Sequence, residues 1–213
     1  REQLQIGLPI GSSIFFEASI FSIAGLLMVH FGSAVVAAHQ SVISFTNVFY
    51  CLPLSIAMAS TIAVGYEVGA GRHKEAIQYS YISRVLAIVI AILICAFTFT
   101  HMESISALFT NDEEVYNLIY GFLGYGVFFS AFDAIGTPLQ GILRGYKDVK
   151  IVFYISLISY WGVCFPIAYI LANNPDYGPF GVWIGLLASV IVAGILFTIR
   201  TWYIQHKQVP IKA

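Results

Sequence analysis

Residues 79–100 read YSYISRVLAIVIAILICAFTFT, and Arg84 is the only charged residue among them. An α-helix rises 1.5 Å per residue, so a helix over this stretch is about 33 Å long. That length matches the hydrocarbon core of a bilayer, which is about 30 Å thick and is crossed by about 20 apolar residues. The stretch therefore predicts a transmembrane helix.

Five further stretches have the same apolar character as residues 79–100. The six predicted spans are residues 6–29, 41–66, 79–100, 115–142, 151–172 and 179–200. The composition agrees, because 59% of the residues are hydrophobic and only 10% are charged, which is outside the usual range of soluble domains. The stretches also lack the regular alternation of membrane β-strands. We therefore expect an all-α integral membrane protein with six transmembrane helices.

The basic residues indicate how the chain is oriented in the membrane. Six spans place both termini on one side, and all the Lys and Arg residues fall on that side: Arg1, Arg72, Lys74, Arg84, Arg144, Lys147, Lys150, Arg200, Lys207 and Lys212. The loops of the other side carry only acidic charges, at Glu103, Asp112, Glu113, Glu114 and Asp176. Because cytoplasmic loops retain Lys and Arg, we expect both ends in the cytoplasm and the protein in the cell membrane.

The chain begins at Arg1 and enters an apolar stretch almost at once. No initiator methionine or signal peptide comes first, so we expect a fragment or one half of a larger protein. Cys51, Cys95 and Cys164 all lie within the apolar stretches, where a free cysteine is ordinarily a small buried residue and not a metal ligand. We expect no resident cofactor and no nucleic-acid partner.

Two carboxylates, Glu17 and Asp133, fall in the middle of apolar stretches. Each lies about eleven residues, or roughly 16 Å, from the predicted cytoplasmic end of its helix. An ionised carboxylate at the centre of a bilayer costs roughly 2.5–3.5 kcal/mol on insertion scales, so the pair requires a bound cation, a proton or a polar cavity. If the first and fourth helices share an interior, both side chains can bind one cation, which points to ion-coupled transport.

The residues around Asp133 favour a hydrated site. Pro138 has no amide hydrogen and its ring crowds the carbonyl of Ala134, so backbone oxygen is freed beside Asp133. Oxygen ligands suit a hard cation. A simple kink in the helix is the alternative interpretation of Pro138, since proline is common in membrane helices. Further along, we expect Arg144 and Lys147 to hold the cytoplasmic loop at the lipid headgroups.

Three segments carry a family resemblance. They are residues 4–10, LQIGLPI, followed by Phe16 and Glu17; residues 64–71, VGYEVGAG; and residues 140–148, QGILRGYKD. In these segments the chain resembles the C-terminal lobe of a multidrug and toxic compound extrusion (MATE) transporter, most closely the NorM-type branch. The resemblance covers essentially the whole chain, as the seventh to twelfth transmembrane helices of such a transporter.

The resemblance implies a twelve-helix antiporter with two lobes, of which the N-terminal lobe is missing here. A drug cavity between the lobes would open alternately to each side of the bilayer. The cation site of the NorM branch maps to Glu17 and Asp133, with Na⁺ as the candidate metal ion, and aromatic residues of that site in some members correspond to Tyr50 and Tyr154. Na⁺ or H⁺ entering from outside would neutralise the carboxylates and favour outward release of a lipophilic, mostly cationic drug.

Other functions share some of these features. An intramembrane aspartyl protease also uses two buried acids, but its Gly-x-Gly-Asp signature is missing before Asp133, so we expect no enzyme. A lipid or lipid-linked oligosaccharide flippase of the same superfamily would need basic residues in its cavity for phosphate. None of the Lys and Arg residues lies in the middle of a predicted span, which favours cationic cargo. A half-transporter that works as a dimer is a further alternative.

Overall fold

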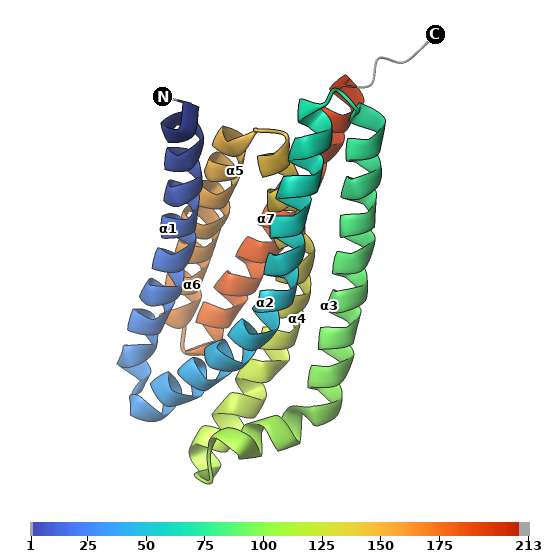
Figure 1. The fold of residues 1–213 in the computed structure, drawn as a ribbon. Helices are drawn as coiled ribbons and strands as arrows, with labels where there is room; N and C mark the ends of the chain where they lie inside the picture. Colours follow the sequence, from blue (N-terminus) through green and yellow to red (C-terminus); the bar gives the residue numbers. More distant parts are fainter. Residues whose placement is uncertain (1, 209–213) are drawn as a thin grey trace.

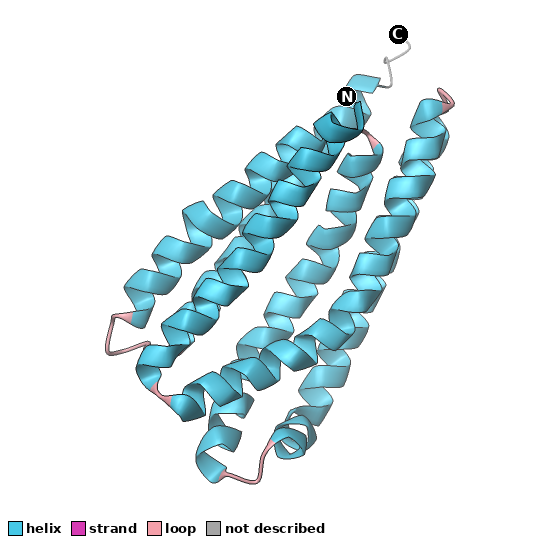
Figure 2. Cartoon of the chain, turned by 60° about the vertical axis from the view of Figure 1, so that its left-hand side comes forward, coloured by secondary structure: helices cyan, strands magenta, loops and turns pink. Residues whose placement is uncertain are grey.

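The computed structural model describes residues 2–208, which form helices joined by short loops (Figures 1 and 2). The elements in chain order are α1 (Glu2–Met28), the 3₁₀ turn η1 (Val29–Phe31), α2 (Ser33–Gly69), α3 (His73–Phe109), α4 (Glu113–Gly145), α5 (Val149–Ser156), the π-helix η2 (Leu157–Cys164), α6 (Phe165–Ala172) and α7 (Phe180–Gln208). No strand occurs in this described range. Because α5, η2 and α6 run on as one span, six units are long and apolar enough to cross a membrane, and the predicted fold class is confirmed.

The helices extend well beyond the apolar stretches that predict them. Helices α2 and α3 have 37 residues each, which corresponds to about 55 Å of helix. This length exceeds the hydrocarbon core, so their ends reach past it or the helices tilt. Hydropathy predicts the middle of each span because the outer turns carry polar residues, such as His39 and Gln40 near the start of α2.

Helix α4 lies at the centre of the larger group of helices, which also contains α2, α3 and α7. It packs along α2 most extensively, and it also contacts α3 and α7. Helix α1 is attached differently, because its main contacts are with α5 and η2 of the fifth span (Figure 1). The two groups meet where α6 and η2 pack on α7. As a result, α1 and α4 face each other across an opening that α2 borders.

Both described chain ends lie at the same end of the bundle, together with the α2–α3 and α4–α5 connections (Figure 1). The basic residues gather at this end, apart from Arg1 and Lys212, which lie outside the described residues. Arg72 is bound by the Glu67 carboxylate, with 2.5 Å between Nε and Oε2, and this contact raises the pKa of the guanidinium above its usual range. Arg200 binds Asp148 at 2.6 Å and so ties the α4–α5 loop to α7.

Helices α2 and α4 touch backbone to backbone at two glycines one turn apart. A Cβ atom on Gly141 would lie 2.2 Å from the carbonyl oxygen of Ala57, and one on Gly145 would lie 2.9 Å from Val64 Cβ. The Thr61 hydroxyl crosses the same contact and reaches the carbonyl oxygen of Gly141 at 3.0 Å. Small residues spaced four apart allow this approach of helices in membranes, where dispersion and hydrogen bonds replace the hydrophobic effect.

We predict that Gly141→Ala destabilises the full-length protein. The added methyl group has no space against the Ala57 backbone, and overpacking of this kind costs about 1–3 kcal/mol. The melting temperature of the purified protein in detergent measures the effect. Gly124→Ala is the matched control, because it lies on the same helix with nothing within 4 Å of the added Cβ. Equal melting temperatures for both variants would contradict the proposed contact.

Candidate functional site

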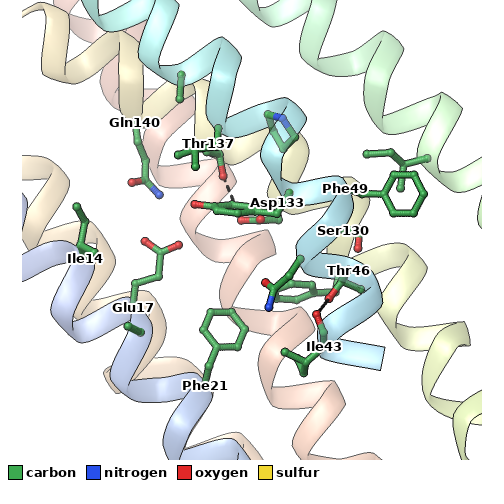
Figure 3. A pocket seen from close by; sticks show the side chains of 18 of the residues that line it. Ile14, Glu17, Phe21, Ile43, Thr46, Phe49, Ser130, Asp133, Thr137 and Gln140 are labelled. Atoms are coloured by element: carbon green, nitrogen blue, oxygen red, sulfur yellow. Dashed lines mark hydrogen bonds between the residues drawn. The ribbon is translucent and has the colours of Figure 1, made fainter. Parts of the chain in front are cut away.

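A cavity of about 430 Å³ lies between α1, α2 and α4 (Figure 3). Most of its wall is apolar, with aromatic rings from Phe21, Phe49 and Phe129. The polar side chains of the wall are Glu17, Thr46, Asn47, Tyr50, Ser130, Asp133, Thr137, Gln140 and Arg144. A mostly apolar cavity with a few convergent polar groups is typical of a binding site for small molecules.

The structure brings the two mid-span carboxylates to this one cavity. Glu17 extends from α1 and Asp133 from α4, and Figure 3 shows both pointing into the space between the helices. The two groups interact electrostatically, so they repel each other when both are ionised. Asp133 accepts a hydrogen bond from Thr137 Oγ1 at 3.3 Å. Glu17 and Asp133 therefore form an acidic pair that a shared cation or proton would relieve.

The face of α4 that meets the cavity is a row of four polar residues: Asp133, Thr137, Gln140 and Arg144. Their spacing of four, three and four residues keeps them on one side of the helix. Hydrogen bonds link them in pairs, because Thr137 donates to Asp133 and Arg144 Nη2 donates to Gln140 Oε1 at 3.2 Å. The sequence contains this signal, since counting in helical steps from Asp133 leads to Arg144.

The expectation that Arg144 lies at the lipid headgroups is wrong, because its side chain lines the cavity. In an α-helix the Cα–Cβ bonds tilt toward the N-terminus of the helix. A long side chain in the last turn of α4 therefore reaches back into the bundle, toward Gln140, and not outward past the helix end. The position of the Cα atom along the helix does not show that the side chain turns into the cavity.

The tyrosines behave differently from one another. Tyr50 of α2 lines the cavity, and its hydroxyl is a hydrogen-bonding neighbour of Thr137. Tyr154 of α5 is 55% exposed and packs its ring against Phe153, with 5.3 Å between the ring centres, so the structure does not bring it to the cavity. Tyr160, which no pattern in the sequence singled out, is only 2% exposed and is a hydrogen-bonding neighbour of Glu17.

The π-helix η2 sets the direction in which Tyr160 faces, whereas Tyr154 precedes it on α5. A π-helix takes more residues per turn than an α-helix, so residues after Leu157 face other directions than an α-helical count predicts. Trp161 follows Tyr160 and donates from Nε1 to the carbonyl oxygen of Phe16 at 3.3 Å. The signal in the sequence is Pro166, which lacks an amide hydrogen just after η2 and so disrupts the regular α-helical ladder.

The donor set fits a hard cation better than a transition metal. No group of three His, Cys, Asp or Glu residues that could hold a metal ion occurs within residues 2–208. Around the acidic pair, neutral oxygens are available from Tyr50, Thr137 and Gln140. Carboxylate, hydroxyl and amide oxygens are ligands for hard cations.

The MatE family model matches residues 9–170, which is more than half of the chain. The chain belongs to the MatE family. Two bacterial relatives, each described as "Probable multidrug resistance protein NorM", agree with this assignment. The protein of Halalkalibacterium halodurans is 44% identical over 97% of this chain and 45% of its own length. The protein of Geobacillus kaustophilus is 45% identical over 94% of this chain and 44% of its own length.

Solved structures of MATE transporters share this fold. The eukaryotic MATE transporter AtDTX14 superposes with a TM-score of 0.89 at 25% identity, over 97% of this chain and 47% of that chain. The bent form of the Vibrio cholerae MATE transporter VcmN gives a TM-score of 0.84 at 16% identity, over 97% of this chain and 47% of that chain, which supports the fold alone. This MatE chain is thus a multi-pass membrane protein that spans about half the length of the relatives it matches.

We predict that Tyr160→Phe slows efflux by the full-length protein about tenfold under an imposed ion gradient. The substitution removes one hydroxyl beside Glu17, and a hydrogen bond to a charged group contributes about 1.5–3 kcal/mol. Initial rates of efflux from proteoliposomes provide the measurement. Tyr154→Phe is the matched control on the same span and keeps the wild-type rate, because its side chain lies outside the cavity. A slow Tyr154→Phe variant beside a normal Tyr160→Phe variant would reverse this assignment.

Proposed function

We propose that the chain is the C-terminal lobe of a cation-coupled antiporter that exports lipophilic, mostly cationic compounds. The observation that carries the proposal is the convergence of Glu17 and Asp133, from two different helices, on one cavity within the membrane. Ionisable residues at membrane depth are costly and are found mainly on ion or substrate pathways. Membership of the MatE family and the multidrug resistance names of the relatives support export as the activity.

In the proposed cycle, the coupling ion and the drug compete through the acidic pair. Na⁺ or H⁺ from outside neutralises Glu17 and Asp133, and the neutral state favours outward release of the drug. Linkage makes the effect reciprocal. The coupling ion lowers the affinity for a drug cation that prefers the ionised pair, and the drug lowers the affinity for the ion. The rings of Phe21, Phe49 and Phe129 would contact the apolar part of the drug, and an aromatic face also attracts a cation.

The opening between α1 and α4 supports alternating access as the route. Glu17 belongs to α1, which packs on the fifth span, whereas Asp133 belongs to the group formed by α2, α3, α4 and α7. A cation held by both carboxylates would draw the two groups together, and its release would let the carboxylates repel each other. Occupancy of the site would therefore bias the relative position of the helices, which is the requirement for coupling.

The complete transporter, in this proposal, contains an N-terminal lobe on the same polypeptide and lies in the cytoplasmic membrane. The support is that the chain spans about half the length of its relatives. Both ends of the chain would face the cytoplasm, because the basic residues gather there and the opposite end of the bundle carries acidic residues such as Glu103 and Asp112. A dimer of half-transporters is the alternative way to complete the cavity.

A flippase for phosphate-bearing lipids is the second candidate, and the position of Arg144 favours it. Such a flippase needs a basic residue in its cavity, and Arg144 does line this one. An arginine binds phosphate oxygens through a fork of donors. Against this candidate, the same cavity holds two carboxylates, which would repel a phosphate group. Transport driven by imposed ion gradients separates the two functions.

We predict that Glu17→Gln and Asp133→Asn each abolish ion-driven efflux while the protein still inserts into the membrane. Each change removes one of the two charges that the coupling ion must neutralise. The assay is efflux of a fluorescent lipophilic cation from proteoliposomes of the full-length protein, driven separately by a Na⁺ gradient and by a pH gradient. Normal efflux in both variants would exclude a shared ion site, and no response of the wild type to either gradient would favour the flippase.

We predict that labelling of introduced cysteines places the acidic loops outside the cell and the basic loops in the cytoplasm. In a cysteine-free background, Asn111→Cys in the α3–α4 loop should react in intact cells with a maleimide that does not cross membranes. Lys74→Cys, at the start of α3, should react only after the cells are opened. Both positions are exposed, so access to the reagent depends on the side of the membrane alone. The opposite pattern would invert the topology.

A further inference from the structure

Three side chains in the cavity wall carry a charge when they are ionised. They are the carboxylates Glu17 and Asp133 and the guanidinium of Arg144. The other titratable neighbours of the acidic pair are the phenols Tyr50 and Tyr160, which are neutral at pH 7. When all three charged groups are ionised, the cavity therefore carries one net negative charge and not two.

Arg144 is held inside the cavity and is not a surface charge that merely overlaps it. Its Nη2 atom donates to Gln140, which is only 5% exposed, and its Nε atom is buried without a hydrogen-bond partner among the described residues. The guanidinium interacts electrostatically with Glu17 and Tyr50 across the cavity. A buried cation is costly unless a charge compensates it, and arginine stays protonated at physiological pH. Glu17 is thus the group that compensates Arg144 across the opening.

We propose that Arg144 is a built-in counter-ion that sets how many charges the site accepts: one Na⁺ or one proton at a time, with divalent cations excluded. The inference rests on the proposed coupling role of Glu17 and Asp133. One monovalent cation makes the cavity neutral, whereas a second Na⁺ or a divalent cation would leave a positive charge in apolar surroundings. That surplus is unfavourable because interactions between charges are strong where the dielectric constant is low.

Arg144 also keeps ion binding reversible. An entering cation has to share Glu17 with the guanidinium, so it binds less tightly than it would to two uncompensated carboxylates. A coupling ion must leave on the other side of the membrane in every cycle, and an acidic pair without a counter-ion would retain it. The guanidinium is tethered four residues from its partner Gln140, so it remains available when the ion departs.

The test uses the purified full-length protein and compares Arg144→Gln with the wild type. Binding of radioactive sodium gives the Na⁺ affinity, and displacement of a fluorescent lipophilic cation as the pH is lowered gives the proton response. Removal of the guanidinium should lower the half-saturating Na⁺ concentration at least about tenfold and move the midpoint of displacement to higher pH. It should also allow millimolar Ca²⁺ to compete with Na⁺, which the wild type does not permit.

Several variants separate the counter-ion from general effects of charge or folding. Arg84→Gln removes a positive charge from α3 outside the cavity and should leave both affinities unchanged. Arg144→Lys keeps the charge and should still exclude Ca²⁺. Arg144→Met keeps an apolar stem and serves in place of Arg144→Gln if that variant fails to fold. A gain in affinity is a result that simple destabilisation cannot produce.

A charge-restoring pair makes the test independent of any single variant. Glu17→Gln alone leaves the cavity without net charge and should lose Na⁺ binding, although Asp133 is intact. Adding Arg144→Gln to it returns the cavity to one negative charge and should restore binding. Failure of this rescue would overturn the proposal that Arg144 is a counter-ion, and so would unchanged affinities in both Arg144 variants. Neither result would contradict coupling by Glu17 and Asp133. If the wild type responds to neither Na⁺ nor pH, the proposed function itself fails and the counter-ion with it.

Discussion

The backbone contact between α2 and α4 fixes the positions of most polar groups in the cavity. Gly141 lies against the Ala57 backbone at a distance that leaves no space for a side chain, and Gly145 repeats the contact one turn later. Because two rigid helices touch at these points, Tyr50 on α2 keeps a fixed position relative to Asp133 and Thr137 on α4. Two glycines therefore determine where the polar side chains of α2 and α4 lie in the cavity.

Hydrogen bonds within the polar row on α4 lower the cost of placing it in a membrane. Thr137 donates to Asp133 and Arg144 donates to Gln140, although the Nε atom of Arg144 stays buried without a partner among the described residues. The charges are balanced only in part, however, since the second carboxylate comes from α1. In the proposed function, this residual negative charge attracts the coupling cation, because interactions between charges are strong where the dielectric constant is low.

The spans and the acidic pair could be predicted from sequence because both depend only on hydropathy and on position along the chain. Hydropathy adds up over about 20 residues, and a carboxylate such as Glu17 stands out at membrane depth because it is costly there. Arg144 and Tyr160 could not be found in this way. The position of the Arg144 charge depends on the direction of its side chain along α4, and the facing of Tyr160 depends on the wider turn of η2. Estimating depth from a constant α-helical rise misses both effects, although the helical spacing from Asp133 does put Arg144 on the cavity face of α4.

In the proposed cycle, the attachment of α1 connects the site to a movement of the lobe. Glu17 has Tyr160 as a hydrogen-bonding neighbour, and the preceding residue, Phe16, accepts a hydrogen bond from Trp161, so α1 is tied to η2 at the level of the acid. A π-helix can return to α-helical geometry with a change of phase, and such segments are frequent at functional sites. In the proposed cycle, loss or gain of the charge on Glu17 therefore acts on two structures together: the gap between α1 and α4, and the turn that carries Tyr160. Movement of α1 need not be separate from ion binding, because the same carboxylate takes part in both.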